Sequence, residues 1–197
     1  MKTTALPVLC LFILALYATS CKQKDKNPHV IIYSQYGDIE LELYPDKAPK
    51  SVAAFLSYVE KGLYKNCFFY RILSLDNQPM GSNASELVQG GLWANKNSKD
   101  SLPGILHETT KLTGLHHTSG TISLARQEPG TATTEFFICI GDQPGFDFGG
   151  ENNPDGQGYA AFGKVVKGME IVLKIYTRPE ENQFFDPPVK ISKIERK

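Results

Sequence analysis

The stretch His29-Val-Ile-Ile-Tyr-Ser-Gln-Tyr-Gly-Asp-Ile-Glu-Leu-Glu-Leu-Tyr44 carries the strongest structural signal in the chain. In its second half Ile39, Leu41 and Leu43 alternate with acidic residues, which is the period of a β-strand with one buried and one wet face. The polar residues 35–37 separate this half from an apolar first half. The stretch therefore predicts a β-hairpin.

Beyond this hairpin, short apolar runs alternate with turn-forming residues. Six runs predict further strands, at residues 67–73, 87–89, 121–125, 135–140, 159–166 and 189–194. Helical spacing predicts only two helices, at 46–62 and 169–176. Because closure removes exposed strand edges, this balance favours a mainly β fold, a closed eight-stranded antiparallel β-barrel capped by two α-helices. Three polar stretches, 74–85, 93–103 and 141–158, predict loops.

The composition is that of an ordinary folded chain. Of its 197 residues 41% are hydrophobic and 11% aromatic, which argues against disorder. The 21 basic and 21 acidic side chains cancel, so no electrostatic attraction to nucleic acid is expected. We expect one domain at 29–197, acting as a monomer without nucleic acid.

The first residues predict export. The apolar run at 6–17 is too short to cross a bilayer as a helix, and small residues then lead directly to Cys21. This order resembles a bacterial lipobox. It predicts a lipoprotein signal peptide at 1–20, an acylated Cys21 and a lipid-anchored tether at 21–28. The protein would then reside in the cell envelope, in the periplasm or at the cell surface, with Cys21 as its only membrane contact. The alternative is an ordinary signal peptide cleaved near Ser20.

Cysteine and histidine positions suggest no metal site. Cys67 and Cys139 each lie in an apolar run, which favours burial as small hydrophobic residues, although an exported protein could pair them. His116 and His117 are adjacent, so in a strand or helix they point apart and cannot both face one metal ion. We expect neither a metal nor a cofactor. No motif supports a hydrolase triad of His107, Glu108 and Ser119 either.

The order of several motifs resembles the cyclophilin family of peptidyl-prolyl isomerases. The resemblance runs from about residue 29 to 195. The matching segments are 37–49, Val52-Ala-Ala-Phe55, Phe69-Tyr-Arg-Ile72, Gln89-Gly-Gly91, 120–126, Glu135-Phe-Phe-Ile138 and 162–169. It implies a barrel with an active groove on one outer face, and proline-containing polypeptides as substrates.

The resemblance also implies site residues. Arg71 matches the family's catalytic arginine, and Gln89 matches the amide that orients it. Phe137 matches the aromatic floor under the proline ring, with Leu87, Phe146 and Tyr159 around it. Ala125 and Arg126 match residues that pair with the peptide backbone.

Two positions depart from the family pattern. Glu86 falls where the family has an apolar wall, and Glu135 falls where it has a neutral glutamine. A carboxylate near Arg71 could hold the guanidinium in place, or occupy its donors and compete with substrate. The resemblance therefore implies an isomerase that assists the folding of exported proteins. The alternative is a catalytically weak proline-peptide binding module or chaperone on a lipid anchor.

Overall fold

The computed structural model describes residues 27–93 and 102–197. The expected signal peptide at 1–20, Cys21 and most of the tether therefore lie outside the described residues. Within the described part, no helix is both long and apolar enough to cross a membrane.

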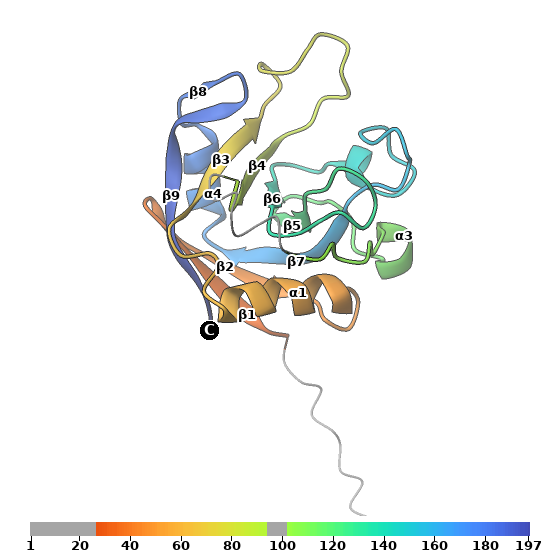
Figure 1. Cartoon of the computed structure of the whole chain (residues 1–197). Helices are drawn as coiled ribbons and strands as arrows, with labels where there is room; N and C mark the ends of the chain where they lie inside the picture. The colour runs from red at the N-terminus through yellow and green to blue at the C-terminus, as the bar shows by residue number, and fades with distance from the viewer. Residues whose placement is uncertain (1–26, 94–101) are drawn as a thin grey trace, which may run out of the picture.

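One antiparallel sheet organises the described residues (Figure 1). Its strands are β1 His29–Ser34, β2 Gly37–Leu43, β3 Cys67–Leu73, β4 Leu87–Gly91, β5 Thr121–Leu124, β6 Phe136–Cys139, β7 Ala160–Lys167, β8 Glu180–Glu181 and β9 Phe184–Arg196. They follow the order β1-β2-β7-β5-β6-β4-β3-β9-β8, and β1 also pairs with β9. Eight strands thus close into the expected barrel, while β8 pairs with β9 alone.

Two helices confirm the helical spacing read from the sequence. Helix α1 spans Pro49–Glu60, with proline in its first turn, and α4 spans Met169–Tyr176. Their apolar faces enter the same core as the strands. A short helix α3, Thr110–Thr113, and a 3-10 turn at Pro144–Phe146 were not predicted, because such short elements carry no periodic signal.

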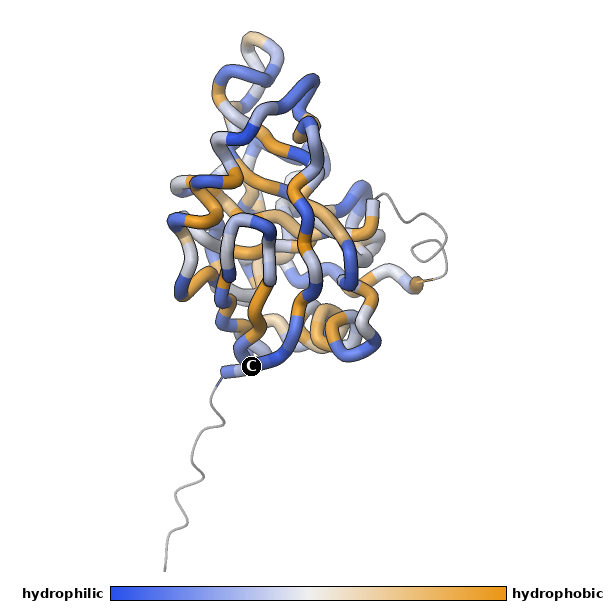
Figure 2. Tube along the Cα trace, turned by 90° about the vertical axis from the view of Figure 1, so that its left-hand side faces the viewer, coloured by the Kyte–Doolittle hydropathy of each residue, from blue (hydrophilic) through white to orange (hydrophobic). Residues whose placement is uncertain are grey.

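The apolar side of the opening hairpin packs as its alternation predicts, while Glu40 on the other side is also buried. Ile39, Leu41 and Leu43 are fully buried, and they join α1 side chains such as Val52 and Phe55 in one core. Hydrophobic and hydrophilic residues alternate along much of the trace in Figure 2. Burial of one face of each strand against the two helices is the main stabilising contribution to such a barrel.

Strand β9 is longer than predicted. The sequence indicated only 189–194, whereas the strand has 13 residues, Phe184–Arg196. Pro187 and Pro188 interrupt the apolar pattern and hide its first half. Its partner β8 has two residues, too few to detect from sequence.

Both described cysteines are free and buried, which confirms the expected burial. Burial raises the pKa of the Cys67 thiol to about 12. Burial also raises the pKa of Cys139, so both groups remain thiols at neutral pH.

The structure separates the three residues considered for a hydrolase. Glu108 accepts hydrogen bonds from the backbone amides of Lys50 and Ser51, at 3.0 and 2.8 Å, and so caps the start of α1. His107 instead contacts the Gln157 carbonyl, and the Ser119 amide donates to the carboxylate of Asp142.

Candidate active site

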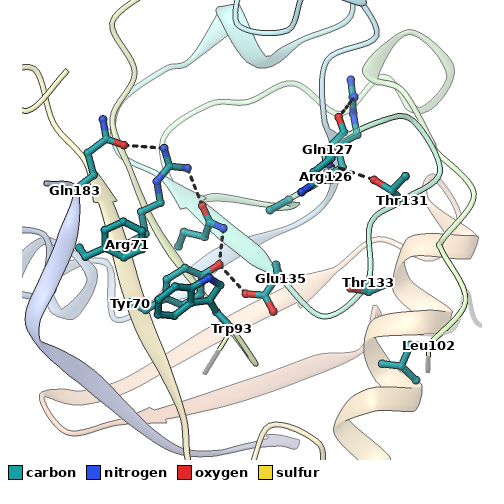
Figure 3. Close-up of a pocket in the computed structure, with 13 residues that line it drawn as sticks. Tyr70, Arg71, Trp93, Leu102, Arg126, Gln127, Thr131, Thr133, Glu135 and Gln183 are labelled. Carbon is teal, nitrogen blue, oxygen red and sulfur yellow. Dashed lines mark hydrogen bonds between the residues drawn. The ribbon is translucent and has the colours of Figure 1, made fainter. Parts of the chain in front are cut away.

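A cavity of about 680 Å³ opens beside β3 and β4 (Figure 3). Its lining combines the expected arginine and glutamine with residues from four other segments. The lining residues are Tyr70, Arg71, Gln89, Trp93, Leu102, Ala125, Arg126, Gln127, Thr131, Thr133, Glu135, Gln183 and Phe184.

Arg71 projects from β3 between two amide side chains. Its Nη1 donates to Gln89 Oε1 at 3.3 Å, and its Nη2 donates to Gln183 Oε1 at 2.8 Å. Gln89 lies directly across on β4, where the register pairs it with Arg71. The expected link between these two residues is therefore present, and Gln183 adds a second partner.

A line of hydrogen bonds continues from Gln89 along the cavity wall to Glu135 (Figure 3). Gln89 Nε2 donates to the Tyr70 hydroxyl at 2.6 Å, and that hydroxyl donates to Glu135 Oε2 at 2.7 Å. Burial, and next the charge of Glu135, raise the pKa of Tyr70 far above its usual value, so its hydroxyl remains a donor. The Tyr70 proton is thus committed to the carboxylate, and its oxygen accepts from Gln89. This orientation turns the Gln89 oxygen toward Arg71.

Glu135 lies at the cavity wall and contacts Tyr70, Leu92 and Thr134. Both Arg71 and Glu135 line the cavity, but the interactions of the described residues include no ion pair between them. Glu135 Oε1 accepts from the Leu92 amide at 3.0 Å and from the Thr134 hydroxyl at 3.1 Å, and Oε2 accepts from Tyr70. The carboxylate is 7% exposed and accepts from these donors, which link it to Arg71 through Tyr70 and Gln89.

The residues expected around a proline ring form an apolar cluster next to the cavity. Leu87, Phe137 and Phe146 are buried together, and the half-buried Tyr159 packs against them. The three aromatic rings contact one another nearly edge to face, with centroid separations of 5.2 to 5.3 Å. Ala125 both packs on this cluster and lines the cavity, so it joins the two halves of the site.

Arg126 is positioned by the 141–158 loop. It forms an ion pair with Asp155 at 2.6 Å, and its Nε donates to the Gly158 carbonyl at 2.9 Å. The Arg126 hydrogen bond, the largest cause, lowers the Asp155 pKa to about 2. The guanidinium lies 5.4 Å from the Tyr159 ring centre, so this loop is tied to the edge of the apolar cluster.

The structure does not place Glu86 with the other site residues. Its carboxylate accepts a hydrogen bond from the Tyr176 hydroxyl of α4 at 2.6 Å, and it is absent from the cavity lining. Glu86 immediately precedes Leu87, and neighbouring side chains along an extended segment point to opposite sides. Leu87 therefore enters the apolar cluster while Glu86 turns away from it.

Three aromatic side chains at the cavity were not predicted. Trp93 stacks on Tyr70, with ring centres 5.3 Å apart, and also contacts Phe184 at 5.4 Å. Trp93 is 46% exposed and Phe184 is 40% exposed. Trp93 and Phe184 lie outside any recognised motif, and Phe184 is brought to β3 only by the unpredicted start of β9.

A buried polar group supports the floor of the apolar cluster. His117 stacks on Phe137, with ring centres 6.0 Å apart; its Nε2 lies 2.9 Å from Ser123 Oγ and its Nδ1 lies 2.7 Å from Asp147 Oδ1. His116 also contacts Asp147, so the two adjacent rings meet at the two oxygens of one carboxylate. They lie outside any strand or helix, where the rule of opposite faces does not apply.

The contacts among Ser123, His117 and Asp147 have the order of a hydrolytic triad, but not its accessibility. Ser123 is 0% exposed and His117 is 1% exposed. A nucleophile must reach the substrate carbonyl, and nothing from solvent reaches this serine. The group instead ties the 3-10 turn that carries Phe146 to the rest of the cluster, because Asp147 immediately follows that turn.

Comparisons with known proteins agree on one family. The sequence profile described as cyclophilin type peptidyl-prolyl cis-trans isomerase/CLD matches residues 29–196. Peptidyl-prolyl cis-trans isomerase A of Dickeya dadantii (strain 3937) is 38% identical over 158 residues, which cover 79% of this chain and 75% of that protein. Isomerase B of Escherichia coli (strain K12) is 35% identical over 147 residues, covering 74% and 82%.

A solved structure shares the fold. The crystal structure of a cyclophilin type peptidyl-prolyl cis-trans isomerase of Cryptosporidium parvum superposes with a TM-score of 0.68. The match covers 87% of this chain and 98% of the other, at 21% sequence identity. At this identity the likeness bears on the fold alone.

Proposed function

The chain belongs to the cyclophilin-type peptidyl-prolyl cis-trans isomerases, and from this premise we propose that it speeds the folding of exported proteins at a bacterial cell envelope. The family reaction is rotation about Xaa-Pro peptide bonds. Without a catalyst this rotation faces a barrier of about 18–20 kcal/mol and takes tens of seconds or longer. An exported chain with a non-native prolyl isomer cannot finish folding until this rotation occurs. An isomerase at the cell envelope would shorten that delay.

One observation carries the proposed mechanism: Arg71 is held at the cavity by two neutral amides. A guanidinium has five N–H donors, so donors remain for a substrate. A hydrogen bond from Arg71 to the prolyl nitrogen would withdraw the lone pair that gives the peptide bond its double-bond character. A charge-assisted bond worth about 1.5–3 kcal/mol supplies one to two decades of rate.

The remaining rate enhancement would come from gripping the substrate on both sides of the rotating bond. We assign the proline ring to the aromatic cluster of Phe137, Phe146 and Tyr159, in which Tyr159 is half-buried and packs edge to face against the two buried rings. Ala125, between this cluster and Arg71, would contact the peptide backbone together with Arg126. Fixing the proline while Arg71 acts on its nitrogen favours the twisted state over either planar isomer.

An isomer-specific assay on a short Xaa-Pro peptide, with full-length protein in detergent, tests this assignment. Arg71→Ala should lower kcat/KM by about 10² with little change in thermal stability. Arg196→Ala is a matched control, since Arg196 is an exposed arginine of β9 that contacts Glu60 on the surface. If Arg71→Ala and Arg196→Ala were equally active, Arg71 would not be the catalytic residue.

The alternative of a weak binding module depended on carboxylates that crowd Arg71. Glu86 contacts Tyr176, and Glu135 contacts Tyr70, Leu92 and Thr134. Neither forms an ion pair with Arg71 among the described residues. The arginine therefore keeps its charge available for substrate, and no observation favours the alternative.

The proposed location rests on the sequence alone. A short apolar segment that ends in Ala18-Thr-Ser-Cys21 supports acylation of Cys21, and the attached lipids would hold the enzyme at the membrane. Partitioning into a detergent phase tests this for wild type and Cys21→Ser made with the native leader. Wild type should enter the detergent phase and the variant the aqueous phase. Equal partitioning of the two into water would refute the lipid anchor.

A further inference from the structure

The turn between β8 and β9 has an unusual second residue. The register pairs Glu181 with Phe184, which leaves Asn182 and Gln183 as a two-residue turn. Both have positive φ, 53° for Asn182 and 71° for Gln183. Turns of this kind favour asparagine followed by glycine, because a side chain on a left-handed backbone is strained. A glutamine at the second position therefore requires a reason.

The Gln183 side chain supplies that reason, because it is fully engaged at the catalytic strand. Its Oε1 accepts from Arg71 Nη2 at 2.8 Å, and its Nε2 donates to the Asn77 carbonyl at 3.2 Å. The Gln183 amide donates to Glu180 Oε2 at 2.7 Å, and its carbonyl accepts from the Ile72 amide at 2.9 Å. The residue is thus fixed at both its backbone and its side chain.

Gln183 accepts from one terminal nitrogen of the Arg71 guanidinium (Figure 3), and Gln89 accepts from the other. Two acceptors on two different nitrogens fix both the plane and the direction of the group. Both acceptors are neutral, so they orient Arg71 without cancelling the charge that polarises a substrate. A carboxylate in either place would form an ion pair and compete for that charge.

We infer that Gln183 is a positioning residue for catalysis: the β8–β9 turn accepts a strained glutamine because its amide holds Arg71 in the orientation that meets the prolyl nitrogen. This inference rests on the proposed role of Arg71. Strain retained at one residue, together with a specific contact from that residue, is the expected signature of such a role.

Two substitutions distinguish the role of the Gln183 side chain from that of the turn backbone. Gln183→Gly and Gln183→Asn both suit the left-handed backbone better than glutamine does. Neither reaches Arg71, since asparagine is one methylene shorter and glycine has no side chain. Asn182→Gly alters the same turn without touching Arg71 and serves as the matched control. All variants are compared as full-length protein in detergent.

We expect both Gln183 variants to lower kcat about tenfold, the effect of losing one charge-assisted hydrogen bond from Arg71, while thermal stability stays equal or rises. Asn182→Gly should retain wild-type kcat. Trp93, the single tryptophan, lines the cavity, so its fluorescence can follow peptide binding separately from turnover. The dissociation constant of the peptide should change less than twofold.

Combination with Arg71→Ala distinguishes positioning from a general effect on the fold. Gln183→Gly should cause no further loss when Arg71 is already alanine, because it acts through the arginine. Wild-type kcat in both Gln183 variants, or a loss that simply adds to that of Arg71→Ala, would overturn the inference. If Arg71→Ala were itself fully active, the proposed function would fail at Arg71 instead.

Discussion

Replacing Glu135 by glutamine should slow the isomerase, because the change disturbs the hydrogen bonds that orient Gln89. The Glu135 carboxylate accepts from Tyr70 on one oxygen and from Leu92 and Thr134 on the other. A glutamine offers only one oxygen, and its second terminal atom is a donor. One of the two groups of donors must therefore face an NH₂.

Each orientation of the new amide has a cost. If its NH₂ faces the Leu92 amide, a buried donor loses its partner, which costs about 1–3 kcal/mol of folding free energy. If its NH₂ faces Tyr70, the hydroxyl accepts from it and no longer suits the Gln89 donor. Gln89 then turns its own NH₂ toward Arg71, and the charge-assisted hydrogen bond between them is lost, which at about 1.5 kcal/mol lowers kcat/KM about tenfold.

The assay measures kcat/KM and the unfolding midpoint for wild type, Glu135→Gln and Glu60→Gln, the last being an exposed control on α1. Glu135→Gln should be slower, less stable, or both, and Glu60→Gln should match wild type. A Glu135→Gln enzyme that is faster than wild type and equally stable would refute this reasoning. That result would mean that the carboxylate competes with substrate for Arg71.

Other regions of the molecule make further predictions. Because the folded-state pKa of Asp155 is lowered to about 2, its ion pair with Arg126 stabilises the fold above about pH 4 and is lost as the pH falls toward 2. Denaturation midpoints measured from pH 5 to 2 should therefore fall more steeply for wild type than for Asp155→Asn; parallel curves would contradict this. Cys67 and Cys139 should resist a thiol reagent at pH 8 until the protein unfolds, as followed by mass, since both are buried and their pKa values are raised; rapid labelling of native protein would exclude that burial. Glu108→Ala should lower the unfolding free energy by about 1–3 kcal/mol by removing the α1 cap, with kcat/KM unchanged, and an equally stable variant would show that water replaces the cap.

Local patterns were enough to predict most of the barrel. The fold retains two patterns that depend only on neighbouring residues: the alternation of Ile39, Leu41 and Leu43, and the apolar runs at β3 to β7. The β8–β9 hairpin was missed because β8 is short and prolines interrupt β9. The pattern of a strand is visible only where side chains alternate over several residues.

Site residues could be predicted where a family motif contains them. Hydrogen-bond partners from distant parts of the sequence could not. Arg71 and Gln89 could be paired from their motifs. Gln183 could not, since it is 112 positions from Arg71 and belongs to an undetected turn. Glu135 was expected near Arg71, but its hydrogen bond with Tyr70 could not be predicted, because it depends on the orientation of both side chains. Such directions are decided by packing, which one sequence does not reveal.

Closure of the barrel by its final strand has a consequence for how the enzyme matures. Strand β9 pairs with β1 from Val30 opposite Arg196, and with β3 from Cys67 opposite Ile191. The strand that carries Arg71 therefore keeps an open edge until β9 pairs with it. Contacts between the two ends of a chain form slowly, because the loop must close before they are gained.

Synthesis runs from the N-terminus, so β9 is the last of the described strands to be made. Before then Arg71 also lacks Gln183, which lies just ahead of β9 and is placed by the β8–β9 pairing. Truncation within the final 13-residue strand should thus leave a chain that contains Arg71 and Gln89 yet has no assembled site. Pairing of β9 with β3 thus assembles the site, and activity should appear only once the barrel has closed.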